Sequence, residues 1–72
     1  MLLLDVLELF SEVYCEIYDP VDGSVYFQGY VLDAIYKFKN RRDKYSGEEY
    51  ELADLMTIDE KTGILYIPVK PY

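Results

Sequence analysis

A turn-forming sequence, Asp-Pro-Val-Asp-Gly, lies in the middle of the stretch Val13–Val31, between two segments rich in β-forming Val, Ile, Tyr and Phe. Pro20 fixes φ near the value that a type I turn requires, and Gly23 can adopt the left-handed conformation that closes such a loop. Asp19 can accept hydrogen bonds from the turn amides. The stretch therefore predicts a β-hairpin, around which the rest of the chain has to pack.

The side chains of both arms alternate, but the sequence leaves the pairing of the arms open. If aliphatic residues pair with aliphatic residues, the hairpin places four tyrosines on one face. A four-residue loop, Pro20 to Gly23, instead shifts the register by one residue and mixes the faces. In both registers the two faces carry large side chains, so we expect helices to cover one face, and the rest of the fold or a partner to cover the other. The tyrosines are Tyr14, Tyr18, Tyr26 and Tyr30.

Before the hairpin, apolar residues recur at the i, i+3, i+4, i+7 spacing of an amphipathic helix, which we expect over residues 2–12. Asp5, Glu8 and Glu12 recur at i, i+3, i+7 and form an acidic stripe on that helix. Such a stripe is typical of a solvated face, and it can also contribute charge to a partner surface. The apolar N-terminal segment is too short to span a bilayer and is interrupted by acids, so we expect a cytoplasmic protein with no membrane contact.

After the hairpin, Asp33 is expected to cap a helix or helical turn that runs through Phe38. The dense basic run at residues 37–44 belongs to this part of the chain, with five Lys and Arg residues against one Asp. The run is typical of a solvated helix face, and the alternative is a patch that contacts phosphates.

Residues 48–58 fit two structures, a helix begun by a Ser-Gly-Glu-Glu capping box or a strand over about 51–58 interrupted at Asp54. We favour the strand, because residues 59–63 repeat the D-x-x-x-G spacing of the first turn and a β-rich segment follows. Pro68 lacks an amide donor, so the last strand is expected to lie at an edge or to end there.

These elements predict a single small α+β domain over residues 1–72, with a four-stranded, mostly antiparallel sheet packed by an N-terminal helix in the order α-β-β-α-β-β. A chain of this length buries only about 60% of its unfolded surface, and such chains often gain burial by oligomerising. A homodimer is therefore one expected state. The expected core is Leu3, Val6, Leu7, Phe10, Val13, Ile17, Val25, Phe27, Ile35, Met56, Ile58, Leu65 and Ile67.

The sequence contains one cysteine and no histidine, which excludes an internal disulfide and every His-based nucleophile, base or metal site. Its serines lack a nucleophile-elbow context, and its glycines do not form a phosphate loop. Asp19 and Asp22 could contact Ca²⁺, but their turn lacks the D-x-D-x-D-G spacing and a closing glutamate. We therefore expect no enzyme activity, no cofactor and no metal, and we expect Cys15 to be a small apolar strand residue.

The net charge of −7 is unevenly distributed. Residues 1–36 carry seven acids and no Lys or Arg, residues 37–44 sum to +4, and residues 45–72 sum to −4. This field disfavours direct binding to nucleic acid through phosphates and favours a basic protein partner, such as a nucleic-acid-processing enzyme.

Tyrosine is abundant, with nine in 72 residues and no tryptophan. Its ring supplies rigid, amphipathic contact area that binding surfaces favour, although a single tyrosine is more often a half-buried strand residue. Acids together with flat rings also suggest mimicry of a nucleic acid. The first helix alone carries one acid per about 5 Å, against one charge per about 1.7 Å of duplex, so other acids or a dimer would have to complete the surface. The candidate partner-binding residues are Asp5, Glu8, Glu12, Glu16, Asp19, Asp22, Tyr14, Tyr18, Tyr26 and Tyr30.

The order of a short Leu-rich acidic helix, the strand VYCEIYD, a D-x-x-x-G turn and the sequence VYFQGYVLD resembles the small acidic orphan proteins of phages and conjugative elements in Gram-positive bacteria. That group includes anti-CRISPR proteins, many of which are small and acidic and bind a nuclease. The resemblance implies that nuclease inhibition is open to this chain, and it assigns no site residues. The basic run at residues 37–44 departs from that outline.

The leading hypothesis is a non-catalytic inhibitor that occupies the basic nucleic-acid-binding groove of a partner such as a CRISPR nuclease. The alternative is a self-assembling, homodimeric scaffold or interaction module whose tyrosines form the dimer interface. A third class, a nucleic-acid binder, would use the basic run.

Overall fold

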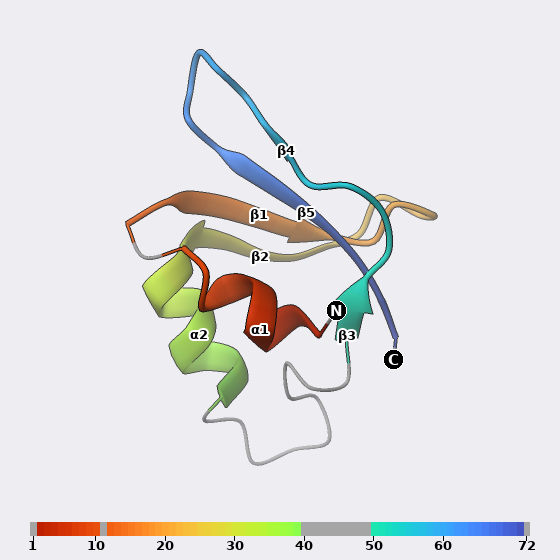
Figure 1. Ribbon diagram of the computed structural model, residues 1–72. Helices are drawn as coiled ribbons and strands as arrows, with labels where there is room; N and C mark the ends of the chain where they lie inside the picture. The colour runs from red at the N-terminus through yellow and green to blue at the C-terminus, as the bar shows by residue number, and fades with distance from the viewer. Residues whose placement is uncertain (1, 11, 40–49, 72) are drawn as a thin grey trace.

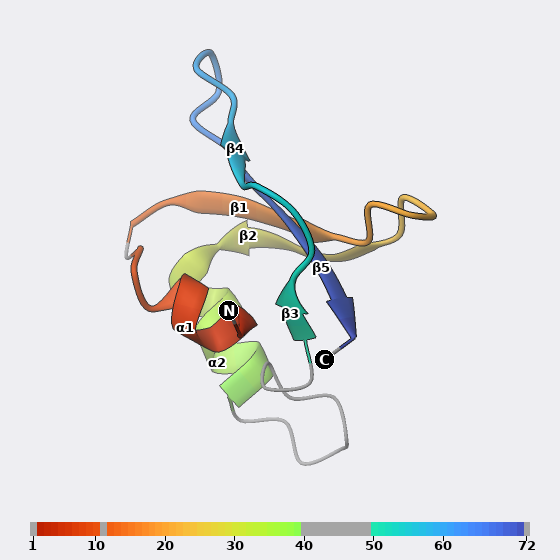
Figure 2. The ribbon, with the colours of Figure 1, turned by 45° about the vertical axis from the view of Figure 1, so that its right-hand side comes forward.

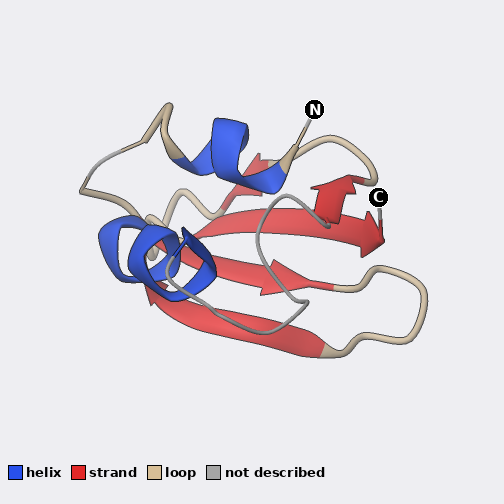
Figure 3. Cartoon of the chain, turned by 90° about the horizontal axis from the view of Figure 1, so that it is seen from below, coloured by secondary structure: helices blue, strands red, loops and turns tan. Residues whose placement is uncertain are grey.

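The computed structural model describes residues 2–10, 12–39 and 50–71. Within these ranges the chain is α+β, with two helices on one face of a mixed, open sheet of five strands (Figures 1 and 3). The elements are α1 (Leu3–Leu7), β1 (Tyr14–Tyr18), β2 (Val25–Tyr30), α2 (Val31–Lys39), β3 (Tyr50–Leu52), β4 (Thr57–Ile58) and β5 (Leu65–Pro71).

The sheet has the strand order β2-β1-β5-β3, and β4 pairs with β5 beside β3. β1 and β5 form a parallel pair at its centre, whereas the pairs β1–β2, β3–β5 and β4–β5 are antiparallel. The α+β class is confirmed, but the expected four-stranded sheet is wrong in strand count and order among the described residues. The parallel pair arises because the chain crosses from the first hairpin through α2 before β5 returns beside β1, and parallel neighbours need such a crossover.

The strand expected over about 51–58 is present as two short pieces, β3 and β4, that both pair with β5. The chain leaves the ladder between them, at residues 53–56. Pro68 does not place β5 at an edge, because β5 is bordered by β1 on one side and by β3 and β4 on the other. The capping box proposed for the alternative helix, at residues 46–49, lies outside the described residues.

Helix α1 is shorter than the expected helix over 2–12. After Leu7 the chain tightens into i→i+3 hydrogen bonds, in which the amide of Leu9 donates to the carbonyl of Val6 and that of Phe10 to the carbonyl of Leu7, both at 3.1 Å. This turn lets Phe10 pack against the core, and it leaves Leu9 66% exposed.

Helix α2 follows β2 without a linker, so Asp33 is not its cap and lies in its first turn. A negative charge there is favourable beside the positive end of the helix dipole. The amide of Val31 donates to the carbonyl of Val13 at 2.9 Å, which fixes the start of α2 to the chain entering β1. The buried side of α2 consists of Val31, Ala34 and Phe38.

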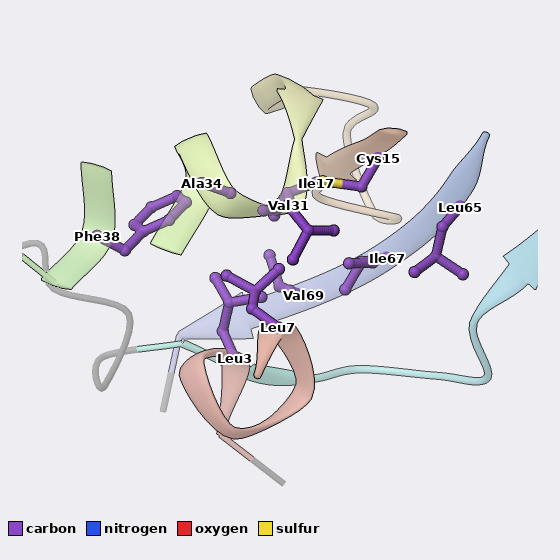
Figure 4. Packing of buried hydrophobic residues seen from close by; sticks show 10 residues of the cluster. All are labelled: Leu3, Leu7, Cys15, Ile17, Val31, Ala34, Phe38, Leu65, Ile67 and Val69. Atoms are coloured by element: carbon purple, nitrogen blue, oxygen red, sulfur yellow. The ribbon is translucent and has the colours of Figure 1, made fainter. Parts of the chain in front are cut away.

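The core lies between the sheet and the two helices, where Leu3 and Leu7 of α1 meet the side chains of β5 (Figure 4). Val25 and Ile58 were expected in this core, but they are 49% and 57% exposed. Val25 pairs with Tyr18 beside an exposed turn, and Ile58 lies in a hairpin that projects away from the helices (Figures 1 and 2). The buried apolar residues are Leu3, Val6, Leu7, Cys15, Ile17, Val31, Ala34, Phe38, Leu65, Ile67 and Val69.

The register of the first hairpin contains a β-bulge. Cα partners run from Tyr14–Tyr30 to Ile17–Phe27, and the next pair is Tyr18–Val25, so Tyr26 is an extra residue on β2. A bulge re-aims side chains locally. Here it places both Tyr26 and Phe27 against the core.

Candidate functional site

The sheet has one face packed on the helices and one face on which neither described helix lies (Figures 1 and 3). Cys15 and Ile17 of β1, with Leu65 and Ile67 of β5, are buried on the helix side. Because side chains alternate along a strand and cross-strand partners share a face, the intervening residues point the other way. Six residues of this outer side, Tyr14, Glu16, Tyr18, Gln28, Tyr30 and Tyr66, we call the tyrosine face. Pro68, the β5 partner of Tyr18, lies on the same side but is buried.

Tyr14 and Tyr30 form a cross-strand aromatic pair on the tyrosine face. Their ring centroids are 5.4 Å apart and their planes meet at 81°, the edge-to-face geometry that aromatic pairs favour. The two residues are 40% and 57% exposed. A preformed ring pair of this kind offers apolar contact area at little further cost in side-chain entropy.

Glu16 lies at the centre of the tyrosine face. Tyr14 and Tyr18 flank it along β1, Gln28 is its partner on β2, and Tyr66 is its partner on β5. The Gln28 side-chain amide donates to Oε1 of Glu16 in an exposed hydrogen bond, which orients the carboxylate of this half-buried residue. Glu16 forms no ion pair with any residue in the described ranges.

Lys70 and Glu51, on the same side of the sheet as the tyrosine face, form an ion pair in which their charges cancel. Nζ of Lys70 lies 3.6 Å from Oε1 of Glu51, and these residues are cross-strand partners on β5 and β3. Among the six residues of the tyrosine face, Glu16 is the one that carries a charge.

Tyr26 was expected among the partner-binding rings, but the bulge turns it to the helix side. Its ring lies 5.3 Å from that of Tyr50, which in turn lies 6.2 Å from that of Phe38. Its hydroxyl donates to Oδ2 of Asp19 at 3.3 Å. Burial, with the nearby Asp19 carboxylate, raises the pKa of Tyr26.

Asp19 and Asp22 are occupied in the hairpin turn. The amide of Val21 donates to Oδ1 of Asp19 and the amide of Ser24 donates to Oδ1 of Asp22, both at 2.8 Å. The hydrogen bonds from Ser24 lower the pKa of Asp22. These two acids define the turn geometry.

Two of the remaining expected acids belong to α1 and not to the tyrosine face. Asp5 is on α1 and Glu8 caps its C-terminus, on the other side of the sheet, and both are exposed. Glu12 is exposed and lies beyond the helix, two residues before Tyr14, so the helical stripe is interrupted. The structure thus brings together Tyr14, Glu16, Tyr18 and Tyr30 on one face, and it places Asp5, Glu8, Asp19, Asp22 and Tyr26 elsewhere.

Tyr66 is a member of the tyrosine face that the sequence analysis missed. Its neighbours Leu65 and Ile67 were both expected in the core, and alternation then requires the residue between them to point outward. That signal was present in the sequence.

Lys37, the first residue of the basic run, is engaged along β2. Its Nζ donates to the carbonyl oxygen of Tyr26 at 3.1 Å and lies 5.6 Å and 5.7 Å from the ring centroids of Phe27 and Phe38. The rest of the run from residue 40 onward lies outside the described residues, so the phosphate-patch alternative stays a prediction.

The described ranges contain one thiol, that of Cys15. Cys15 is buried, and desolvation raises the pKa of its thiol to about 11, which keeps it protonated near neutral pH. Within residues 2–10, 12–39 and 50–71, no three His, Cys, Asp or Glu side chains gather closely enough to hold a metal ion, and there is no pocket.

None of the helices in the described ranges has the length and apolar character needed to cross a bilayer. Comparisons with protein-family models, with curated proteins and with solved structures found no match.

Proposed function

We propose that this protein is a non-catalytic protein-binding module that places its tyrosine face on a basic surface of a partner protein. The observation that carries the proposal is the exposed Tyr14–Tyr30 pair beside the Glu16 carboxylate, on a sheet face that neither described helix covers. Tyrosine is enriched at the centres of binding sites, and the net charge of −7 favours a cationic partner.

The specific form of this proposal is inhibition of a nucleic-acid-processing enzyme, such as a CRISPR nuclease, by occupation of its basic groove. The separation of the acids supports a compact contact through the tyrosine face over an extended imitation of a phosphate backbone along α1. Asp5, Glu8 and Glu12 then act at longer range, by accelerating encounter with a basic groove.

The test is DNA cleavage by a panel of purified RNA-guided nucleases, titrated with the wild-type protein and with the double variant Tyr14→Ala/Tyr30→Ala. For a nuclease that the wild-type protein inhibits, we expect the double variant to inhibit at least about tenfold more weakly, since loss of two central rings costs 1.4 kcal/mol or more. The matched control is Tyr36→Ala, which removes a tyrosine that is 72% exposed on α2, away from the tyrosine face.

Equal losses for the double variant and the control would contradict the assignment of the tyrosine face. A panel in which no nuclease is inhibited would contradict the inhibitor form of the proposal. The first outcome counts only if the variants unfold at the same denaturant concentration as the wild-type protein.

A homodimer through the same face is the second candidate, favoured by the exposure of Tyr14 and Tyr30 in so small a domain. Opposing it, each copy carries a net charge of −7, and a two-fold interface would bring two Glu16 carboxylates together. Sedimentation equilibrium separates the two candidates: a dimer that dissociates on Tyr30→Ala supports self-assembly.

A further inference from the structure

We propose that the tyrosine face is a receptor for an arginine side chain, with Glu16 as the guanidinium-binding carboxylate and Tyr14 and Tyr30 as the rings that the arginine contacts. This inference rests on the proposed function and names the chemistry of the partner at that same face.

The first step of the argument is the state of the carboxylate. Glu16 is half-buried, and Gln28 donates to its Oε1, so the side chain is held in one orientation while Oε2 has no hydrogen-bond partner among the described residues. A carboxylate accepts up to four hydrogen bonds, and a guanidinium donates in a planar fork that matches two carboxylate oxygens. Glu16 is thus preorganised for a charge-assisted contact.

The second step is the position of the rings. Tyr14 neighbours Glu16 along β1, and Tyr30 lies diagonally across on β2. These are separations of roughly 5–8 Å between backbone positions, which a bound side chain can span. The edge-to-face packing of Tyr14 and Tyr30 sets their planes at 81°, so the pair exposes ring surface in more than one direction. Guanidinium groups stack on such rings.

The third step is selectivity for charge. Lys70 and Glu51 pair with one another on this side of the sheet, and Glu16 is the charged residue of the tyrosine face, so the face itself carries a negative charge. A phosphate or another anion would meet an unpaired carboxylate there. Lysine satisfies the charge but lacks the planar fork, and its ammonium group is more strongly hydrated than guanidinium. Arginine is therefore the residue that uses both the carboxylate and the rings.

The test is an NMR titration of the ¹⁵N-labelled full chain at low salt with two probes, N-acetyl-arginine-methylamide and N-acetyl-lysine-methylamide. We expect the arginine probe to shift the resonances of Glu16, Gln28 and Tyr30, with an affinity about threefold higher than that of the lysine probe. The variant Glu16→Gln keeps the side-chain shape and removes the charge, and it should weaken arginine binding about tenfold. Glu60→Gln is the matched control, because Glu60 is an exposed glutamate in the turn before β5 and should leave the titration unchanged.

The inference is overturned if Glu16→Gln binds the arginine probe as tightly as the wild-type protein, if lysine binds as well as arginine, or if the shifts spread over all acidic segments. Thermal unfolding of each variant confirms that it is folded, and Tyr30→Ala provides a second variant with an expected loss of about threefold. The probe requires no partner protein. If the arginine probe does not bind but Tyr14→Ala/Tyr30→Ala still weakens nuclease inhibition, only the arginine-receptor proposal fails. If the arginine probe binds but no nuclease is inhibited, only the inhibitor form of the proposed function fails.

Discussion

The two hairpins of this protein, β1–β2 and β4–β5, close with the same turn and then diverge. In each turn the first Asp amide donates to the carbonyl of the residue five positions later, and the glycine amide donates back to the Asp carbonyl. Asp19 and Asp59 each accept an amide hydrogen bond at 2.8 Å from the residue two positions later. Gly23 and Gly63 have φ values of +80° and +75°.

Beyond the turns, equivalent residues have opposite environments. Val25 and Leu65 occupy the same place after their turns, but Val25 is 49% exposed and Leu65 is 5% exposed. Tyr26 packs against the core, whereas Tyr66 belongs to the outer face. The two strands differ because β2 contains the bulge. β2 is an edge strand and can accommodate an extra residue, whereas β5 is hydrogen-bonded to neighbours on both edges. The turn conformation thus depends on local sequence, whereas the neighbouring strands determine which side chains of the following strand point toward the core.

The largest expected effect separates the two positions that follow the turns. Leu65→Ala should lower the free energy of unfolding by about 2–4 kcal/mol, because it opens a cavity in the central strand. Val25→Ala should cost less than about 1 kcal/mol at its half-exposed site. Urea unfolding of both variants, compared at equal m-values, measures the difference. Similar losses would mean that the two hairpins are equally buried and would break the comparison.

The next effect concerns Gly29, which stands where β5 has Val69. Gly29 has φ +154°, and an added Cβ would lie 3.0 Å from the Phe27 ring, so Gly29→Ala should cost about 1–3 kcal/mol. Gly23→Ala is the control, because no atom lies within 4 Å of its added Cβ and only the positive φ opposes it. Chemical denaturation should rank Gly29→Ala as the more damaging, and the reverse order would argue against the bulged register.

A smaller effect distinguishes the two equivalent tyrosines. Tyr26→Phe removes the hydrogen bond to Asp19 and should cost about 1 kcal/mol, whereas Tyr66→Phe should change stability by less than about 0.5 kcal/mol. The folded state raises the pKa of Tyr26 above 10.0, so its contribution is present below pH 10.0 and is lost as the pH rises through the raised value. The difference in unfolding free energy between the wild-type protein and Tyr26→Phe should therefore be present at neutral pH and shrink at alkaline pH. A difference that stays constant with pH would show that Tyr26 does not titrate in this way.

The smallest effect compares the turn residues that precede the glycines. Asp22 and Thr62 each accept the amide two positions later, at 2.8 Å and 3.3 Å, but only Asp22 ionises. The pKa of Asp22 is lowered from 3.8, so its contribution is present above pH 3.8 and is lost as the pH falls through the lowered value. In Asp22→Thr this part of the loss of stability at acidic pH should disappear, which thermal unfolding between neutral and acidic pH measures. If the variant loses as much stability on acidification as the wild-type protein, the pH dependence comes from other carboxylates.

The features that the sequence predicted correctly are local. The Asp and Gly spacing identified both turns, and alternation within β1 grouped Tyr14, Glu16 and Tyr18. The predicted end of the first helix was wrong because the apolar spacing continues to Phe10, while the backbone turns after Leu7 and packs that ring against the core.

The features that it did not predict depend on distant neighbours. The parallel pair joins Cys15 to Leu65, which lie at opposite ends of the chain, and no local pattern in either segment encodes that contact. The bulge that buries Tyr26 depends on an edge position and on the approach of Tyr50, which the same alternation rule could not supply.

The position of β5 also has a consequence for the order in which the protein can acquire its structure during synthesis. β5 supplies Leu65, Ile67 and Val69 to the interior and holds β1, β3 and β4 in place. A nascent chain in which these residues are still inside the ribosome lacks the central strand, so the first hairpin has only the two helices to pack on, and isolated two-stranded hairpins are marginal in water. Folding therefore has to wait until that segment has emerged, and the long-range closure between β1 and β5 is expected to limit its rate.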